Sequence, residues 1–474
     1  MTSQEKPRLT DSKGLGGIIA LDGFDYQLWD ALARLPAWLR HPGFEGFTIE
    51  GLEDFEARFF APHSTCRHIL DRFQAKSGTL SKSELIEVLN SFVSFTLGYP
   101  DVARVHTLVT PALPPALKWI TRDPNRIRRA RPFYSPFSDI LAASDEKLRQ
   151  DLIEEFGSEL GGFFADSIEV ALRTFPDRNS AEITFAAAMH DIFPELDISP
   201  RKFKTAFSAL TDLIAQNRGV MLARNHLLEV LDEALGIVLI PDRRLRVHVR
   251  SDRNGAVTDA IEIDANKFSG AEGVFPPLDG WRLDLLAPLE ATSSWARERN
   301  RQRIALSGSY RLSTAFALGW SFRSAIGFEI DIDTRSGAWA TDERPLPDAL
   351  PPPWKFSWPK RLVDNRLVVA IGVLRDPSLD VKKYLGLTEE SGLLIATLPT
   401  ALANGVEAQA CVQTLKVAVS QSVSQLDPKG IDLFFVGPAA LAVTLGHRWN
   451  AMPSTQVHEF VASERHYVPT VIVG

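Results

Sequence analysis

A small set of polar residues near the start of the chain has the types and spacing of a metal-dependent hydrolytic site. Asp54 opens a segment of alternating polar and apolar residues, and Gln74 and Lys76 close a second one. Successive side chains point to opposite faces of a strand, so Gln74 and Lys76 share one face of the second segment. Antiparallel pairing of the two segments then brings Asp54 beside them.

Oxygen atoms from these side chains suit a hard divalent cation, and we expect Mg²⁺. The expected metal ligands are Asp54, the amide oxygen of Gln74, and Glu50, together with a backbone carbonyl near Ala75. Lys76 would ease the formation of hydroxide from water and stabilise negative charge in the transition state. The chemistry indicated is phosphodiester hydrolysis; the alternative is a solvated hairpin whose exposed face carries these residues by chance.

The elements that must position these residues form an α+β arrangement. Apolar residues recur at helical spacing over 18–39, and a second helical pattern covers 83–95. Alternation or β-like composition predicts strands over 47–49, 54–60, 68–76 and 105–110. From 113 to about 230 the pattern is mostly helical, which we interpret as a helical elaboration of the first domain.

Near residue 230 the mostly helical pattern gives way to short strand-like segments, so we predict two domains, 1–230 and 231–474. The second has short strands alternating with helices, which indicates an α/β layer with mostly parallel strands. Its expected strands are 245–249, 260–263, 281–286, 367–373, 393–398, 431–436 and 456–461, with a long helix over 402–426.

A weak internal repeat lies in this second domain. Residues 304–308 form a strand-like run that leads through a glycine turn into a helix ending in Leu-Gly. Residues 431–437 form a second strand-like run, which also leads through a glycine turn into a helix ending in Leu-Gly. Each is followed by a further strand, over 328–332 and 456–461. We therefore expect two related α/β units in tandem.

Glycine turns between a strand and a helix expose backbone N–H groups that bind anions. The residues expected to bind a ligand at the two turns are Ser307, Gly308, Ser309 and Arg311 in the first unit, and Gly437, Pro438 and Ala439 in the second. Trp339 is the preferred aromatic platform for a ligand base. Neither turn matches a dinucleotide fingerprint or a P-loop, so a nicotinamide cofactor or ATP is not indicated.

Bulk charge argues against nucleic acid, because 52 Lys and Arg residues face 59 Asp and Glu residues, a formal net charge of −7. A local arginine cluster argues the other way. Arg126, Arg128 and Arg129 belong to it, and we expect them to contact DNA phosphates. A solvated basic segment is the alternative.

Cysteine content and hydropathy favour a cytoplasmic protein. The chain has 2 cysteines, Cys66 and Cys411, so a disulfide framework is not expected. The first residues lack the apolar run of a signal peptide, and no stretch approaches the roughly 18 apolar residues of a membrane span. No membrane partner is expected.

The hairpin pattern resembles the PD-(D/E)XK nuclease superfamily, with Gln74 in place of the second acid. The helical Gly23-Phe24-Asp25-Tyr26-Gln27 motif looks like the nuclease family found fused to SAVED domains. The resemblance implies a restriction-endonuclease-like fold and places Gln27 within reach of the site.

The segment from 431 to 450 and the following residues 456–460 look like the C-terminal block of the SAVED domain, and 306–315 resembles the corresponding block of its first half. This resemblance implies tandem CARF-like Rossmannoid units that bind a cyclic oligonucleotide. A restriction-like nuclease ahead of SAVED resembles the CD-NTase-associated protein four family, effectors of CBASS anti-phage immunity.

The family resemblance implies an endonuclease that self-associates on binding a cyclic oligonucleotide and degrades double-stranded DNA with little sequence choice. A cyclic trinucleotide is the expected allosteric activator, and a CD-NTase that makes it is the functional partner. Two alternatives stay open. In one, the first domain is inactive or recruits a partner; in the other, the α/β domain is a nucleotide-using metabolic enzyme.

Overall fold

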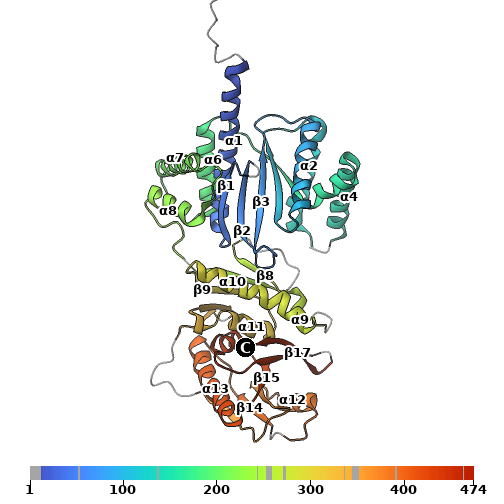
Figure 1. Cartoon of the computed structure of the whole chain (residues 1–474), viewed down its shortest axis with the longest axis vertical. Coiled ribbons are helices and arrows are strands. Elements are labelled where there is room, and N and C mark those ends of the chain that lie inside the picture. Colours follow the sequence, from blue (N-terminus) through green and yellow to red (C-terminus); the bar gives the residue numbers. More distant parts are fainter. Residues whose placement is uncertain are drawn as a thin grey trace, which may run out of the picture. The chain divides into compact units, whose positions relative to one another are not determined.

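The computed structural model describes residues 12–51, 54–135, 138–242, 244–251, 259–270, 274–335, 337–343, 352–389, 392–462 and 464–474. The chain divides into two compact units, Met1–Pro241 and Asp242–Gly474 (Figure 1). The division falls after the predicted boundary near 230, because α8 (Arg224–Leu235) packs on α7 (Pro200–Gln216) and on the first sheet.

The first unit contains a six-stranded mixed sheet in the order β5-β4-β3-β2-β1-β6. Strands β1, β2 and β3 are antiparallel neighbours, whereas β4 and β5 run parallel to β3. The strands are β1 (Phe44–Ile49), β2 (Phe55–Phe60), β3 (His68–Ala75), β4 (Ala103–Thr110), β5 (Ile168–Leu172) and β6 (Leu222–Ala223).

Helices cover both faces of this sheet. Each face of the sheet has its own hydrophobic core, and two consecutive residues of β4 show this. Val109 belongs to the core on the face covered by α1, α6, α7 and α8. Leu108 belongs to the core on the other face, which is covered by α2, α3, α4 and α5. In Figure 1 these two groups flank the strands. The remaining helices are α1 (Ser12–Arg40), α2 (Lys82–Gly98), α3 (Trp119–Ala130), α4 (Asp139–Phe156), α5 (Ser158–Ser167) and α6 (Arg178–Ile192), with short turns η1 (Pro115–Leu117) and η2 (Arg131–Phe133).

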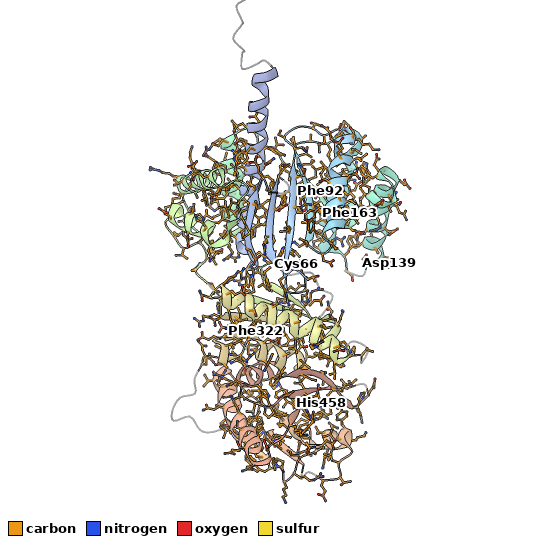
Figure 2. The ribbon with its side chains drawn as sticks, viewed as in Figure 1. Cys66, Phe92, Asp139, Phe163, Phe322 and His458 are labelled. Carbon is orange, nitrogen blue, oxygen red and sulfur yellow. The ribbon has the colours of Figure 1, made fainter. Side chains whose placement is uncertain are left out.

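A buried histidine anchors the α2 side of the sheet. The ring of His106 on β4 stacks on Phe92 of α2 with centroids 4.6 Å apart, and Phe163 of α5 lies 5.7 Å away (Figure 2). Its Nε2 lies 2.9 Å from the Thr96 hydroxyl, and burial lowers the pKa of His106 to about 4. The ring therefore serves as a neutral core residue.

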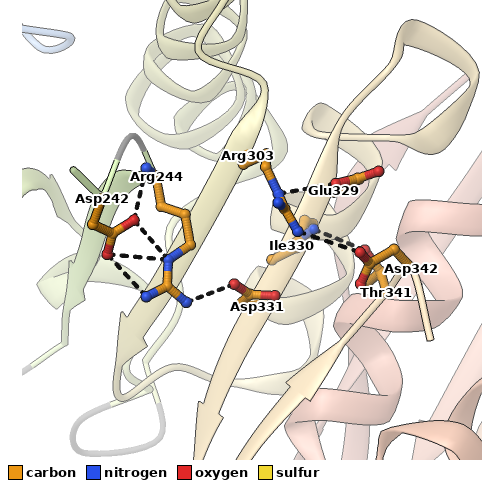
Figure 3. Close-up of polar contacts among 8 residues, drawn as sticks. All are labelled: Asp242, Arg244, Arg303, Glu329, Ile330, Asp331, Thr341 and Asp342. Carbon is orange, nitrogen blue, oxygen red and sulfur yellow. Dashed lines mark hydrogen bonds and ion pairs between the residues drawn. The ribbon is translucent and has the colours of Figure 1, made fainter.

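The second unit begins with a five-stranded sheet in the order β11-β10-β9-β7-β8. Its strands are β7 (Leu245–Arg250), β8 (Ile261–Asp264), β9 (Arg303–Gly308), β10 (Glu329–Thr334) and β11 (Gly337–Ala340). Charged pairs tie the strands laterally: Arg244 bridges Asp242 and Asp331, and Arg303 contacts Glu329 and Asp342 (Figure 3). The turn η3 (Asn266–Phe268) follows β8.

A six-stranded sheet completes the unit in the order β12-β14-β13-β15-β16-β17. Its strands are β12 (Lys355–Ser357), β13 (Arg366–Val373), β14 (Leu393–Leu398), β15 (Gly430–Val436), β16 (Thr455–Val461) and β17 (His466–Val473). Its helices are α12 (Ser378–Leu385), α13 (Gly405–Leu426) and α14 (Ala439–Arg448).

The two sheets of this unit repeat one topology. In the first sheet, β8, β7, β9 and β10 are parallel neighbours and β11 is antiparallel to β10. In the second sheet, β14, β13, β15 and β16 are parallel neighbours and β17 is antiparallel to β16. Strand β7 therefore corresponds to β13, and β9 to β15. Helix α11 (Leu312–Ser321) follows β9 as α14 follows β15, and the two helices pack together. The mixed α/β and α+β fold class is confirmed.

Two local differences from the sequence pattern stand out. Residues 281–286, expected as a strand, form the π-helical turn η5 (Trp281–Leu286), which joins α9 (Leu278–Gly280) to α10 (Ala287–Glu298). Strand β5 interrupts the segment expected to be helical. Most of residues 345–353, which are rich in proline, lie outside the described part of the chain. The short turn η6 (Ser324–Ile326) follows α11.

Candidate functional site

The candidate nuclease site lies at one edge of the first sheet. Strands β1, β3, β4 and β5 all end there, and β2 begins there, because β2 is antiparallel to both its neighbours. Phe55 of β2 pairs with Phe73 of β3, so Asp54, one residue earlier, faces Gln74 across the two strands. The predicted juxtaposition of Asp54 and Gln74 is present.

Two hydrogen bonds fix the Asp54 carboxylate. Its Oδ2 accepts from Nε2 of Gln74 at 2.8 Å and from the backbone N–H of Ala75 at 2.6 Å. A carboxylate accepts hydrogen bonds, so the amide of Gln74 must present its nitrogen to Asp54. The amide oxygen of Gln74 is then directed away from Asp54 and is available to a cation.

Lys76 follows directly on the strand. Its backbone N–H donates to the carbonyl of Val109 at 2.8 Å, and strand alternation puts its side chain on the face of Gln74. The pKa of Glu84, in the first turn of α2, is lowered chiefly by hydrogen bonds from Ser81 and in smaller part by the charge of Lys76. The ammonium group therefore lies near the beginning of α2.

Glu50 joins the site through its backbone. Its N–H donates to the carbonyl of Asp54 at 2.8 Å, and its φ of 54° closes the turn between β1 and β2. Its carboxylate instead contacts the guanidinium of Arg218 at 3.7 Å. Sequence reasoning missed Arg218, since nothing in its local pattern connects it with a residue so distant along the chain.

Gln27 lies on α1, which packs on the opposite face of the sheet from Gln74. Its Oε1 is buried and has no hydrogen-bond partner in the described part of the chain. A buried amide oxygen without a partner is costly, so this group has capacity for a further donor or a cation. No hydrogen bond between Gln27 and the other predicted catalytic residues is present among the described residues.

The donor set fits a hard cation, although it is poor in carboxylates. Asp54 and the amide oxygen of Gln74 provide hard oxygen donors beside the backbone of Ala75. Within the described ranges, no three His, Cys, Asp or Glu side chains are grouped as a metal site. Glu50 would have to leave Arg218 to become the third ligand.

The predicted DNA-contacting arginines lie on α3, where they are exposed. The guanidinium of Arg128 pairs with Glu169 of β5 at 3.2 Å, and Arg126 lies 3.5 Å from Asp123. The side chain of Arg126 is 72% exposed. Local carboxylates therefore offset part of the positive charge of this helix.

In the second unit, two backbone segments approach closely at the first glycine turn. Gly308 has φ of 112°, and a Cβ there would collide with the carbonyl of Val249. Ser307 Oγ lies 3.0 Å from Nδ1 of His248, and Arg311 donates from Nε to the carbonyl of Ser269 at 2.6 Å. Ser309 donates its backbone N–H to Val249.

An internal carboxylate already occupies part of the α11 N-terminus. The backbone N–H of Ser313 donates to Oε2 of Glu459 at 2.8 Å, and Thr470 donates to the Ser313 hydroxyl at the same distance. Burial raises the pKa of Glu459. The backbone N–H groups of Ser309 and Ser313 are therefore already bonded, contrary to the expectation of free N–H groups at this turn. Sequence reasoning missed Glu459, although it lies in the segment 456–460 that resembles the SAVED domain.

The second glycine turn follows the end of β15, where a Cβ at Gly437 would lie 3.0 Å from the side chains of Phe435 and Val373. Gly437, Pro438 and Ala439 are half-buried, and Pro438 immediately precedes α14 without a side-chain cap. Trp339 differs from expectation, because its side chain is 6% exposed and packs in the core beside Gly405 of α13. It presents little surface on which a base could stack.

Comparison with known proteins agrees with this arrangement. Residues 289–473 match the model of the SMODS-associated and fused to various effectors sensor domain, SAVED. CD-NTase-associated protein 4 of Moraxella osloensis is 23% identical over 482 residues, and that of Acinetobacter sp. (strain ATCC 27244 / 9458) is 22% identical over 471. Each alignment covers 98% of this chain and 98% of the relative.

Solved structures extend the likeness to the fold. The Acinetobacter baumannii Cap4 SAVED/CARF-domain containing receptor with the cyclic trinucleotide 2'3'3'-cAAA has a TM-score of 0.76 at 20% identity, covering 95% of this chain and 98% of that one. The Moraxella osloensis Cap4 receptor has a TM-score of 0.71 at 19% identity, covering 95% and 99%. The predicted resemblance to the CD-NTase-associated protein 4 family is therefore confirmed over nearly the whole chain, and residues 289–473 match the SAVED sensor domain.

Proposed function

We propose that the protein is a CBASS effector of anti-phage defence: a cyclic-oligonucleotide-activated, metal-dependent endonuclease that degrades double-stranded DNA with little sequence specificity. The single observation that carries this proposal is the fixed carboxylate of Asp54. Its two hydrogen bonds, to Gln74 and Ala75, hold a hard oxygen ligand at the strand end that continues into Lys76.

The residues of the site divide the chemistry between them. Asp54 and the amide oxygen of Gln74 would hold Mg²⁺ with the carbonyl of Ala75, and Glu50 would add a ligand once released from Arg218. Bound Mg²⁺ would supply Lewis acidity toward the scissile phosphate. Lys76 donates from Nζ to the attacking oxygen or to a phosphate oxygen, which stabilises the negative charge that develops there.

Gln74 positions Asp54 as well as offering a ligand. Because its amide nitrogen is bonded to Asp54, the carboxylate cannot rotate freely, so its geometry is set before the cation arrives. Gln27 lies on α1, on the opposite face of the sheet, so its buried amide would support the site from behind the strands rather than contact the metal. Arg126, Arg128 and Arg129 on α3 would contact DNA phosphates, a contribution that weakens with salt.

A cyclic oligonucleotide, most simply a cyclic trinucleotide, is the proposed activator. The carboxyl ends of parallel strands, where strand order reverses, are the usual ligand sites of open α/β sheets. In the two sheets of the sensor these ends carry Ser307, Gly308, Ser309 and Arg311, and Gly437, Pro438 and Ala439. Support comes also from the relative bound to 2'3'3'-cAAA.

Activation would proceed by self-association of SAVED domains in the cytoplasm. The activator, made by a partner CD-NTase, must bind the assembled state more tightly than the free subunit, since otherwise it could not shift the equilibrium. Clustering then gives avidity for DNA that a single subunit with a net charge of −7 lacks.

Incubation of plasmid DNA with Mg²⁺ and a panel of cyclic di- and trinucleotides tests the proposal. We expect short fragments to accumulate with one member of the panel and not without it, and EDTA to prevent cutting. Intact plasmid under every condition, from a preparation that binds one of the ligands, would contradict the nuclease assignment.

A second candidate is a sensor whose first unit recruits a partner and does not cut DNA. It is favoured by the neutral Gln74 at the position of an acid and by the absence, within the described ranges, of three grouped His, Cys, Asp or Glu side chains. Ligand-dependent capture of a protein without DNA cutting would support this candidate.

A further inference from the structure

We propose that Arg218 binds a phosphate of the DNA substrate at the edge of the first sheet, an inference that rests on the proposed nuclease function. Arg218 lies in the turn between α7 and β6. The next residue, Gly219, donates its N–H to the carbonyl of Ile49 at 2.8 Å, and β6 pairs with β1. The turn is therefore attached to the end of β1, immediately before Glu50.

An aromatic ring orients the guanidinium. The Cζ atom of Arg218 lies 3.5 Å from the centroid of the Phe24 ring, which is buried on α1. A guanidinium stacked on a ring keeps its N–H groups directed outward in the plane, where they can bind two oxygens of one phosphate. Stacking thus holds the cation in position without occupying its donors.

The existing partner leaves this cation accessible. Glu50 lies 3.7 Å away, and the two side chains are 44% and 43% exposed. A charge-assisted hydrogen bond measures about 2.7–2.9 Å, so the contact is loose. By contrast, Arg104 donates two hydrogen bonds to Asp71, at 2.8 and 2.5 Å. An incoming phosphate can therefore displace Glu50 more readily than a bidentate carboxylate.

Acidic groups near Arg218 predict a competition that can be measured. Burial raises the pKa of Asp25 on α1, and the negative charge of Asp22 raises it further. The positive charges of Arg178 and Arg218 lower it. Arg218 is thus close enough to affect Asp25 as well as to contact Glu50. A phosphate must compete with the Glu50 carboxylate, so removal of that charge should strengthen DNA binding in the absence of metal.

The chain offers a matched control for a change at Arg218. Arg40, in the last turn of α1, also lies over an aromatic ring, that of Phe193, at 5.6 Å. It also pairs with a carboxylate, that of Glu195, at 3.1 Å, and is 37% exposed. Because α1 ends at the start of β1, Arg40 lies at the opposite edge of the sheet from Asp54.

The test compares full-length Lys76→Ala protein with its R218Q, R218K, R40Q and E50Q derivatives. Fluorescence anisotropy of a labelled 30-base-pair duplex is measured in EDTA at several salt concentrations, starting at 50 mM, with the cyclic nucleotide that activates plasmid cutting present throughout. We expect R218Q to bind about fivefold to tenfold more weakly and the salt slope to fall by about one unit. R218K should lie between, R40Q should match the parent, and E50Q should bind more tightly.

Thermal melting of each derivative identifies any that fail to fold. If R218Q does not fold, the affinities of R218K and E50Q for the duplex decide whether Arg218 binds phosphate. The Arg218 assignment alone would be overturned if the protein with Lys76 intact cuts DNA but the R218Q derivative binds the duplex with the same affinity and salt slope as its parent. Equal losses in R218Q and R40Q would also overturn it. Failure of the parent to bind DNA, with failure of its Lys76 form to cut, would instead overturn the proposed function.

Discussion

Gly319 and Gly446 lie at the crossing of α11 and α14, and each is covered by the backbone of the other helix. A Cβ at Gly319 would collide with the carbonyl of Val443, and one at Gly446 with the carbonyl of Phe316. The two contacts are reciprocal, as an approximate twofold relation between tandem units requires. The repeated Leu-Gly of the sequence is therefore the packing contact that joins the two halves of the sensor.

Gly446→Ala should destabilise the sensor unit. The added methyl meets backbone atoms that cannot move without separating the helices, so we expect a loss of about 1–3 kcal/mol. Thermal unfolding of the full chain measures it. Gly98→Ala is the control, because a Cβ at this helical glycine meets nothing within 4 Å. An unfolding temperature of Gly446→Ala equal to that of the control would contradict the crossing contact.

Gln74→Glu should make stability dependent on the metal. The new carboxylate cannot donate to Asp54, and two facing carboxylates repel each other, so the variant should unfold at a lower temperature in EDTA at pH 7. Mg²⁺ should restore more stability to the variant than to the wild type, because it binds between two anions. Thermal shift with increasing Mg²⁺ measures this difference, and equal shifts in both proteins would argue against a metal site at Gln74.

His447 should make the sensor less stable in acid. Its Nε2 donates to the carbonyl of Phe328 at 2.9 Å, its Nδ1 is buried without a hydrogen-bond partner among the described residues, and burial lowers its pKa to about 4. The unfolded chain takes up a proton below its ordinary pKa of 6.5, whereas the folded one resists until about 4. As the pH falls from 6.5 to about 4, protonation of the unfolded chain alone lowers the free energy of unfolding, by roughly 3 kcal/mol at the acidic limit.

The measurement is the unfolding temperature of wild type and His447→Gln from pH 7.5 to pH 4.5. The advantage of the wild type should shrink toward the acidic end, because glutamine does not titrate. His106, with its pKa also about 4, is present in both proteins and cancels in the comparison. A constant difference across the range would show that His447 is not held neutral.

Arg311→Ala should weaken binding of the cyclic oligonucleotide by about tenfold, the effect of losing one charge-assisted hydrogen bond to a phosphate. Arg311 is exposed at the end of the first glycine turn, and its present partner is a carbonyl. Arg323→Ala is the control, since Arg323 also donates to a backbone carbonyl, that of Trp320. Titration calorimetry with the tightest binder of a cyclic di- and trinucleotide panel distinguishes them; equal affinities would remove Arg311 from the ligand site.

Periodicity predicted the parts of the fold in which local pattern and burial coincide. In β2, Phe55, Ala57 and Phe59 are buried while Glu56 and Arg58 are half-buried, as the alternation required. The same reasoning failed at 281–286, because Trp281 and Leu285 are both buried and their spacing of four residues is helical. Here a short apolar run fits either period, and packing against the neighbouring helices decides.

The predicted contact between Asp54 and Gln74 is present because adjacent strands create it. Asp54 meets Gln74 because hairpin pairing follows from alternation, and the distance along the chain is short. Arg218 reaches Glu50 only after α7 and β6 fold back onto β1, and Glu459 reaches Ser313 only after the two sensor halves pack. Such contacts depend on tertiary packing that no local pattern encodes. Trp339 was misjudged for the same reason.

The most direct test of the central claim is the rate of plasmid cleavage by wild type and Lys76→Ala in Mg²⁺, with and without the activating cyclic nucleotide. Binding of the same nucleotide is followed in parallel by calorimetry. We predict that the wild type is nearly inert alone and cuts when the ligand is added, and that Lys76→Ala binds the ligand normally but does not cut. Full ligand-dependent cleavage by Lys76→Ala, or equal cleavage by the wild type without ligand, would contradict the account.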